Sequence, residues 1–345
     1  DLFEEYKSKY QYPEVGDILI SASGSIGRTV VYRGADEYFQ DSNIVWLKHD
    51  SQLVNSFLKQ FYSIVKWQGL EGSTIKRLYN KNVLEIPITL PSPEEQTKLG
   101  EFFEKLDNLI TANQRKLDLL KEQKKGYLQK MFPQNGSKFP QLRFAGFADA
   151  WEQRKLGKVF DTITDYVANG SFESLRKNVN SSDINGFAYL VRLQDASNNW
   201  QGPWLYTDQH GYEFLKKSRL QPDDIIMANV GSVGKFFLVP KLDKPMTLAP
   251  NAVLIKSSEN DQGFLYQMML TPEMQHKIFE KTTPGVQSKI NKTDFKMVET
   301  RLPNIEEQEK IGQFFKRLDY TIILHQRKLE KLQELKKGYL QKMFV

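Results

Sequence analysis

Two segments of the chain carry an apolar stripe with the spacing of a long amphipathic helix. In the first, steps of three and four alternate through Leu99, Phe103, Leu106, Ile110, Leu117, Leu120, Tyr127 and Met131, once the two polar positions Asn113 and Lys124 are included. In the second, the same steps run through Ile311, Phe315, Leu318, Ile322, Leu329, Leu332, Tyr339 and Met343, with His325 and Lys336 at the two polar positions. This heptad spacing predicts two coiled-coil helices. Each segment has Glu-Glu near its start and Lys-Lys near its end, which suits the helix dipole.

These two segments are copies of each other. Residues 91–132 and 303–344 align at a constant offset of 212, with 26 of 42 positions identical. Upstream, Gly24-Ser-Ile-Gly-Arg28 is echoed by Gly231-Ser-Val-Gly-Lys235 at an offset of 207. The chain therefore contains two repeats, each a variable globular part followed by a nearly identical helix.

The repeat predicts an α+β fold, with two mixed globular parts separated by two long helices. We expect globular parts at residues 1–90 and 139–302, and the helices within 91–138 and 303–345. In the second globular part, β-rich runs predict strands at 187–192, 225–227 and 252–255, and a helix is expected over 263–281. The first globular part lacks about 70 residues that the second has, so we expect the chain to be truncated at its N-terminus.

Asn113 and His325 occupy vacant positions in the two apolar stripes. A helix of 38 residues is about 57 Å long, which suits a partner of the same kind. If the copies pack antiparallel with their midpoints together, Asn113 faces His325, and this polar pair is expected to set the register. Parallel or intermolecular pairing stays open.

Composition excludes several classes of site. The chain has no cysteine, which removes disulfides and thiolate metal sites, and no two of its four histidines are close in sequence. Neither an apolar run of about 18 residues nor a secretory signal is found, so the cytoplasm is expected and a membrane span is not. The net charge of +6 permits a nucleic-acid partner without requiring one.

Polar and basic side chains gather in three places suited to DNA contact. The repeated glycine-rich segments are either tight turns or turns that hold a backbone phosphate, and the polar loops before the helices either read DNA or are solvated. The third place is the region 165–200. The candidate DNA-binding residues are Ser25, Arg28, Ser232 and Lys235 in the turns, Thr74, Lys76, Arg77, Asn80, Gln287, Lys289 and Asn291 in the loops, and Asn169, Arg176, Arg192 and Asn198 in the third region.

A further segment, residues 123–148, contains no Asp or Glu, which fits either a nucleic-acid or acidic partner or a solvated linker. Catalytic motifs are missing from the sequence, which has no nucleotide-binding loop, no nucleophile elbow and no Asn/Asp-Pro-Pro-Tyr/Phe loop for adenine methylation. Asp223 and Asp224 are interpreted as turn residues, because the first repeat has Asp17 alone at the equivalent place. No catalytic residue or metal ligand is expected in this chain.

Each copied helix has three recognisable motifs: the start Pro-x-x-Glu-Glu-Gln, the centre Gln-Arg-Lys-Leu and the end Lys-Lys-Gly-Tyr-Leu-Gln-Lys-Met-Phe. Two further segments, which start at Pro140 and Trp151, belong to the same pattern. The chain resembles the specificity (S) subunit of type I restriction-modification enzymes. That resemblance implies two target recognition domains, each reading half of a split sequence in double-stranded DNA, spaced by an antiparallel coiled coil. It also implies two methyltransferase (M) subunits, which bring S-adenosylmethionine, and two motor-nuclease (R) subunits, which use ATP and Mg.

Two other classes of protein stay open. A coiled-coil assembly protein, whose flanking domains bind other proteins, predicts no salt-dependent DNA affinity. A free-standing nuclease or methylase requires a catalytic constellation that the sequence does not contain.

Overall fold

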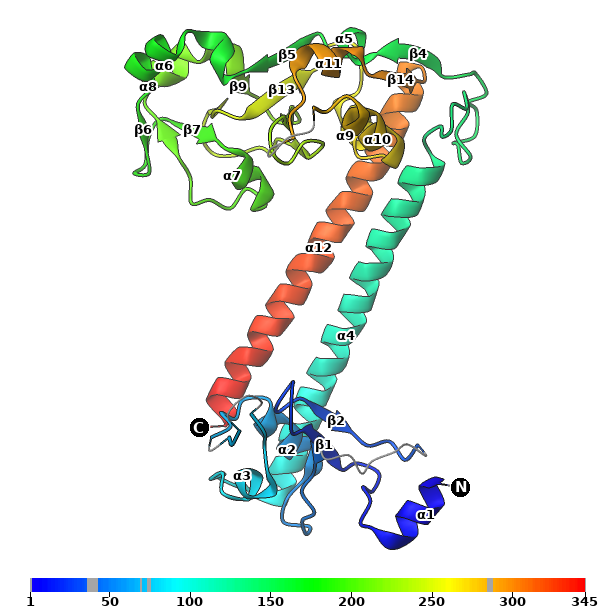
Figure 1. Cartoon of the computed structure of the whole chain (residues 1–345), viewed down its shortest axis with the longest axis vertical. Coiled ribbons are helices and arrows are strands. Elements are labelled where there is room, and N and C mark those ends of the chain that lie inside the picture. The colour runs from blue at the N-terminus through cyan, green and yellow to red at the C-terminus, as the bar shows by residue number, and fades with distance from the viewer. Residues whose placement is uncertain (1, 36–42, 69, 73–75, 284–287, 345) are drawn as a thin grey trace. The chain divides into compact units, whose positions relative to one another are not determined.

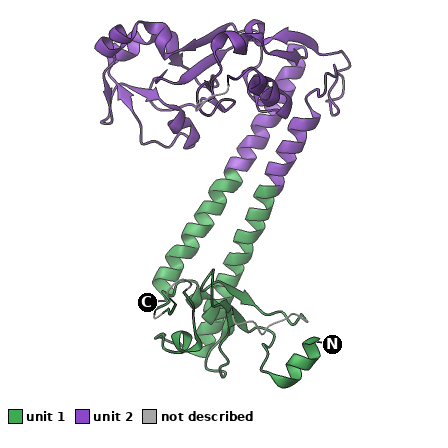
Figure 2. Cartoon of the chain, viewed as in Figure 1, with its two compact units in different colours: residues 1–118, 324–345 green, residues 119–323 purple. Residues whose placement is uncertain are grey.

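The computed structural model describes residues 2–35, 43–68, 70–72, 76–283 and 288–344, which form two compact units. Unit 1 comprises residues 1–118 and 324–345, and unit 2 comprises residues 119–323 (Figure 2). Each unit thus combines one globular part with portions of both long helices. None of the described helices is both long and apolar enough to cross a membrane.

Unit 1 is built on a small antiparallel sheet in the order β2-β1-β3. Its strands are β1 (Ile18–Ser21), β2 (Thr29–Val31) and β3 (Ile44–Val45), and its short helices are α1 (Leu2–Lys9), α2 (Asn55–Tyr62) and α3 (Asn80–Leu84). Ile20 from the sheet and Leu58 and Tyr62 from α2 share one buried cluster. The sheet and α2 therefore form one core.

Unit 2 contains two larger sheets. One has the order β11-β10-β13-β5, with β5 (Thr162–Asp165), β10 (Ile225–Ala228), β11 (Phe236–Leu238) and β13 (Ala252–Lys256). The other has the order β6-β8-β7-β12-β9, with β6 (Ser181–Ser182), β7 (Ala188–Val191), β8 (Tyr206–Thr207), β9 (Arg219–Leu220) and β12 (Met246–Leu248). β4 (Glu152–Lys155) pairs with β14 (Glu299–Leu302). The predicted strands at 187–192, 225–227 and 252–255 are confirmed as β7, β10 and β13. All residues of β7, β10 and β12 are buried.

Short helices flank these sheets (Figure 1). They are α5 (Leu156–Val159), α6 (Phe172–Asn178), α7 (Leu193–Ser197), α8 (Gln209–Phe214), α9 (Gln262–Met269), α10 (Pro272–Glu280) and α11 (Lys292–Met297), with the 3₁₀ turns η1 (Tyr166–Asn169) and η2 (Lys216–Ser218). The single helix expected over 263–281 is wrong, because the chain forms two helices there. Pro272 cannot donate to a continuing helix, and the Thr271 hydroxyl instead accepts from the Met274 amide at the start of α10.

The two copied segments form the long helices α4 (Pro93–Lys130) and α12 (Ile305–Met343). They run antiparallel, and the same two contacts occur in each unit. In unit 1, Asp107 pairs with Lys336 at 2.6 Å and the ring of Phe102 meets that of Tyr339 edge-on at 5.2 Å. In unit 2, Asp319 pairs with Lys124 at 2.6 Å and the ring of Phe314 meets that of Tyr127 edge-on at 4.9 Å. The predicted fold class, with its antiparallel coiled coil, is confirmed.

The alignment of the helices differs from the one expected. The contacts Asp107–Lys336 and Phe102–Tyr339 fix which residues of the two antiparallel helices lie opposite each other. Moving forward along α4 and backward along α12 from these contacts places Asn113 opposite Leu329, within one residue, and not opposite His325. The expected facing is wrong by about one helical turn, because it assumed that the helix ends are flush. The Asn113 amide donates to the Leu109 carbonyl at 2.7 Å, and His325 Nδ1 is buried without a partner in the described part of the chain. A role of Asn113 and His325 in setting the register stays a prediction.

A buried glutamine fixes the start of each long helix. Gln96 is 0% exposed, and its side chain accepts from the Val54 amide and donates to the carbonyls of Gln52 and Pro91, each at 2.9 Å. Its repeat counterpart Gln308 likewise accepts from a backbone amide, that of Asp261, at 3.2 Å. The same device therefore joins each globular part to its helix.

Candidate nucleic-acid interface

The repeated glycine-rich segments are tight turns at the ends of β1 and β10. Gly24 and Gly27 have φ of 66° and 84°, and Gly231 and Gly234 have φ of 74° and 88°. Glycine adopts such angles without steric cost, so the turn geometry explains the repeated spacing. Ser25, Arg28, Ser232 and Lys235 lie on these turns and are exposed.

The polar loops before the long helices lie against the turns. In unit 1, Ser23 and Arg77 form a β-bridge; in unit 2, Val230 and Lys289 form the equivalent one. The Gly231 amide also donates to the Ser288 carbonyl at 2.9 Å. The structure thus places Lys76 and Arg77 with the first turn, and Lys289 with the second, as two similar clusters. Thr74 and Gln287 lie outside the described residues.

In unit 2, the ends of several strands meet at one edge of the sheets. Ala228 at the end of β10 pairs with Ala252, and Asp165 at the end of β5 pairs with Val253. Lys292 Nζ lies 2.7 Å from Asp165 Oδ2 and joins the polar loop to this edge. We call this edge, together with the second turn and residues 288–292, the loop edge.

Four of the candidates hold the fold together. Asn169 accepts from the Lys217 amide at 2.9 Å and donates to the Ser218 hydroxyl at 2.9 Å, and Asn198 donates to the Gly202 carbonyl at 2.6 Å. Asn291 caps α11 by accepting from the Asp294 amide at 2.8 Å. Arg192 forms two hydrogen bonds to the buried Asp195 carboxylate, which raise the pKa of the guanidinium. These polar groups are engaged inside the protein.

The other described candidates present exposed side chains, apart from the partly buried Arg77. They are Ser25, Arg28, Lys76 and Asn80 in unit 1, and Arg176, Ser232, Lys235 and Lys289 in unit 2. The Arg77 guanidinium donates to Asn43 Oδ1 at 2.9 Å. Exposed cationic side chains on turns and loops are suited to contact with DNA phosphates. Arg28 and Lys76 in unit 1, and Lys235 and Lys289 in unit 2, therefore make up the candidate interface.

The one-signed segment 123–148 is partly engaged in the fold. Arg143 donates from Nε and Nη2 to the Glu307 carboxylate, both at 2.7 Å, and Glu307 is 0% exposed. These bonds raise the pKa of Arg143. Lys124 is paired with Asp319, as described above. Two basic groups of this segment thus anchor α12.

The acidic residues of the sequence take structural positions. Asp224 Oδ2 accepts from the Gln221 amide at 2.6 Å and pairs with Lys256 at 2.7 Å. In the first repeat, Asp17 Oδ2 accepts from the Glu14 amide and pairs with Lys48, both at 2.8 Å. Burial raises the pKa of Asp224, against the opposing effect of Lys256. The interpretation of these aspartates as turn residues is supported.

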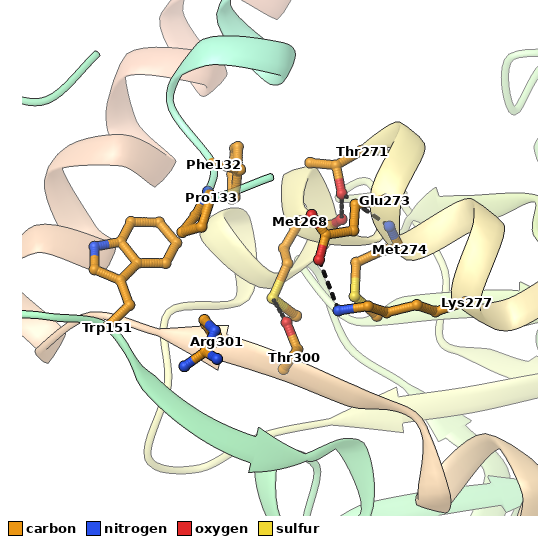
Figure 3. Close-up of a pocket in the computed structure, with 10 residues that line it drawn as sticks. All are labelled: Phe132, Pro133, Trp151, Met268, Thr271, Glu273, Met274, Lys277, Thr300 and Arg301. Carbon is orange, nitrogen blue, oxygen red and sulfur yellow. Dashed lines mark hydrogen bonds and ion pairs between the residues drawn. The ribbon is translucent and has the colours of Figure 1, made fainter. Parts of the chain in front are cut away.

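A cavity of unit 2, beside α9, α10 and β14, has about 20 Å³ of space, enough for a single water molecule (Figure 3). The side chains of Phe132, Trp151, Met268 and Met274 line it together with the Glu273–Lys277 ion pair. Among the described residues, no group of three or more His, Cys, Asp or Glu side chains is placed to hold a metal ion. The cavity is too small for an organic substrate.

The sequence reasoning missed the polar contacts that join globular parts to helices. Gln60 donates to Asp107 at 3.3 Å, and its counterpart Gln267 donates to Asp319 at 2.8 Å. One signal in the sequence could have indicated these contacts. The two copies have the same residue at Asp107 and Asp319, although these positions lie on a helix surface where variation is tolerated.

Comparison with known proteins places these features in one family. A protein of Haemophilus influenzae, named provisionally as a type I restriction enzyme specificity subunit, is 50% identical over 124 residues, which are 36% of this chain and 32% of that protein. The type I restriction enzyme MjaVIII specificity subunit of Methanocaldococcus jannaschii is 22% identical over 336 residues, 93% of this chain and 74% of that protein. The match thus spans about a third of the first relative and about three quarters of the second.

Solved structures share the fold. The S subunit of a type I restriction-modification system from M. genitalium superimposes with a TM-score of 0.61 at 13% identity, covering 98% of this chain and 85% of that one. A chain from a structure of the type I restriction-modification system matches with a TM-score of 0.51 at 14% identity, covering 96% and 82%. The family model described as the type I restriction modification DNA specificity domain matches residues 1–122 and 148–334. The chain therefore belongs to the family of type I restriction-modification DNA specificity proteins.

Proposed function

We propose that this chain is the DNA-recognition subunit of a type I restriction-modification complex and reads a target split into two halves. The observation that carries this proposal is the repetition of one arrangement: a glycine turn, a basic loop and a long helix occur in both units. Two copies of one reading arrangement suit a target with two separate half-sites, because each copy approaches its own segment of the duplex.

The exposed side chains suit such a role. Arg28 and Lys76 in unit 1, and Lys235 and Lys289 in unit 2, would grip phosphates, while Ser25, Asn80 and Ser232 would approach base edges. The two parts carry different residues around a common turn, so each half-site would have its own sequence.

Chemistry on the DNA is proposed for partner subunits. Two methyltransferase subunits would bring S-adenosylmethionine and methylate adenine, and two motor-nuclease subunits would use ATP and Mg to cut unmethylated DNA. The role of this chain would be to select the sequence on which they act. Family membership and the absence of a catalytic motif from the sequence support this division of labour.

Sequencing of N6-methyladenine tests the proposal. DNA would come from a methylation-free host that expresses the full gene with its neighbouring methyltransferase gene. A split motif with a fixed spacer, lost when this gene is removed, is the expected result. If no modified motif depends on the gene, and the purified complex shows no salt-dependent DNA affinity, the proposal is wrong and an assembly role is favoured.

A further inference from the structure

An open pocket of unit 2 adjoins the loop edge and has an exposed phenylalanine on its rim. The pocket measures about 530 Å³, and its lining includes Tyr166, Phe172, Arg176 and Pro250. Tyr166 directly follows Asp165, the last residue of β5, and Pro250 lies just before the start of β13. Both of these strand ends belong to the loop edge, so the pocket continues the candidate interface.

The side chain of Phe172 is left outside the core. It is 82% exposed, the largest exposed fraction among the large apolar side chains that the structure describes. Leu175 and Arg176 share its face of α6, because they follow it by three and four residues. Leu175 is 2% exposed and anchors the helix in a buried cluster with Leu190 and Leu215. The helix is therefore held in place by Leu175, which leaves the ring of Phe172 accessible to a ligand.

The charges beside Phe172 suit a DNA backbone. The acidic side chain that lines the pocket, Glu173, forms an ion pair with Lys177 at 2.8 Å. Arg176 is exposed, and no ion pair to it is seen in the part of the chain that the structure describes. Its guanidinium is therefore available for a phosphate, the group to which most protein–DNA hydrogen bonds are made.

An apolar ring at such an edge has a defined counterpart on a DNA duplex. In the major groove the base edges present hydrogen-bonding groups, and thymine adds its 5-methyl group, which apolar side chains contact. Because a phenylalanine ring has no polar atom, it distinguishes bases through this methyl group. Contact of the same ring with a sugar or a phosphate would carry no sequence information.

We infer that Phe172 is a specificity-determining residue that covers the 5-methyl group of a thymine in the half-site of unit 2, while Arg176 holds a neighbouring phosphate. This inference rests on the proposed function, in which each unit reads one half-site. Residues 1–90 repeat the glycine turn and the polar loop but contain no counterpart of the α6 sequence. The methyl contact is therefore confined to one half-site.

Fluorescence anisotropy of the assembled complex tests this inference, with duplexes that carry the split motif found by N6-methyladenine sequencing. In matched duplexes, deoxyuridine replaces every thymine of one half-site, which removes the methyl groups and keeps the base pairing. The unaltered complex should lose affinity about fourfold for each covered methyl group, in one of the two half-sites only. Phe172→Ala should lose at least as much affinity for the thymine duplex, and deoxyuridine should then have no further effect.

Ile184→Ala is the matched control. This side chain is 76% exposed and precedes the start of β7, whereas the other end of β7, at Val191, pairs with Leu248 close to the pocket. The control complex should keep both the affinity of the unaltered complex and its response to deoxyuridine.

The inference is overturned if the unaltered complex responds to deoxyuridine in neither half-site, or if Phe172→Ala keeps the full affinity or the full response. A variant that weakens target and non-target DNA alike would also overturn it, because the ring would then contact the backbone. So would the loss of a partner subunit in native mass spectrometry, because the ring would then face a protein. If the unaltered complex has no salt-dependent DNA affinity, the proposed function fails as well, which separates the two outcomes.

Discussion

Gly312 of α12 lies directly against Asp261, the residue that caps α9. A Cβ atom at residue 312 would come within 2.1 Å of Asp261 Oδ1, which accepts from the Phe264 amide at 2.7 Å. The repeat counterpart Gly100 lies equally close to Ser56, where a Cβ atom would come within 2.0 Å of Oγ. Each long helix therefore approaches its globular part through a glycine.

Replacing either glycine with alanine should destabilise the protein. Gly100→Ala and Gly312→Ala should each lower the free energy of unfolding by about 1–3 kcal/mol, because the added methyl group forces the neighbouring element away. Gly126→Ala and Gly338→Ala are matched controls, since a Cβ atom there meets nothing within 4 Å. Those two should raise the free energy of unfolding by about 0.5–1 kcal/mol through helix propensity. Urea unfolding measures all four, and equal effects at the four sites would contradict the close approach.

Removing a helix-start glutamine should be costly. Gln96→Ala leaves the Val54 amide and two carbonyls without their partner at a partly buried junction, so we expect a loss of about 1–3 kcal/mol in the free energy of unfolding. Gln114→Ala is the control, because this exposed side chain donates to Asp118 on its own helix and not to a globular part in the described residues. A change below about 0.5 kcal/mol for Gln96→Ala would show that the glutamine does not hold the junction.

The basic residues of the loop edge should act on DNA through phosphates. Lys235→Ala and Lys289→Ala should weaken binding to target and non-target DNA alike. Each should also reduce the slope of log affinity against log salt by about 1. Fluorescence anisotropy of the assembled complex across a salt series measures both effects.

Lys158→Ala serves as the control. This exposed residue lies just before the start of β5, whereas the loop edge lies at the other end of that strand. Unchanged slopes for both loop-edge variants would remove these lysines from the interface.

The stability of unit 2 should depend on pH through Asp161. The hydroxyl and amide of Ser258 donate to its carboxylate at 2.7 and 2.5 Å, and these bonds hold the pKa of Asp161 below its ordinary value of 3.8. A lowered carboxyl pKa contributes stability above the unfolded pKa, and that contribution is lost as the pH falls through the folded value. The free energy of unfolding should be measured from pH 2 to 6. It should fall less on acidification in Ser258→Ala and in Asp161→Asn than in the unaltered protein. An unchanged pH profile in both variants would contradict this role.

The sequence predicted the long helices well because their pattern is local and repeated. A heptad stripe can be identified without knowing what the helix packs against. The apolar stripe from Leu99 to Met131, and its copy, therefore predicted α4 and α12 directly. The alignment of the two helices was not predicted correctly. It depends on contacts between the helices, such as that of Phe102 with Tyr339, and the positions of the helix ends do not determine these contacts.

The candidate interface was predictable only by residue type. Arg28 and Lys235 are on exposed turns as expected, but Arg192 and Asn169 are engaged in hydrogen bonds with Asp195 and Ser218. A basic or amide side chain looks the same in sequence whether it faces a ligand or closes a loop. Its partners come from contacts distant in the chain, as with Asn169 and Ser218, and a single sequence does not contain those contacts.

An exchange of residues 148–302 with the same segment of another family member tests most directly whether two independent readers select the DNA. The exchanged gene would be expressed with the same methyltransferase gene, and N6-methyladenine would be sequenced. One half of the split motif should change, while the other half and the spacer between them stay the same. A motif that changes in both halves, or that keeps both, would contradict the assignment of one half-site to each unit.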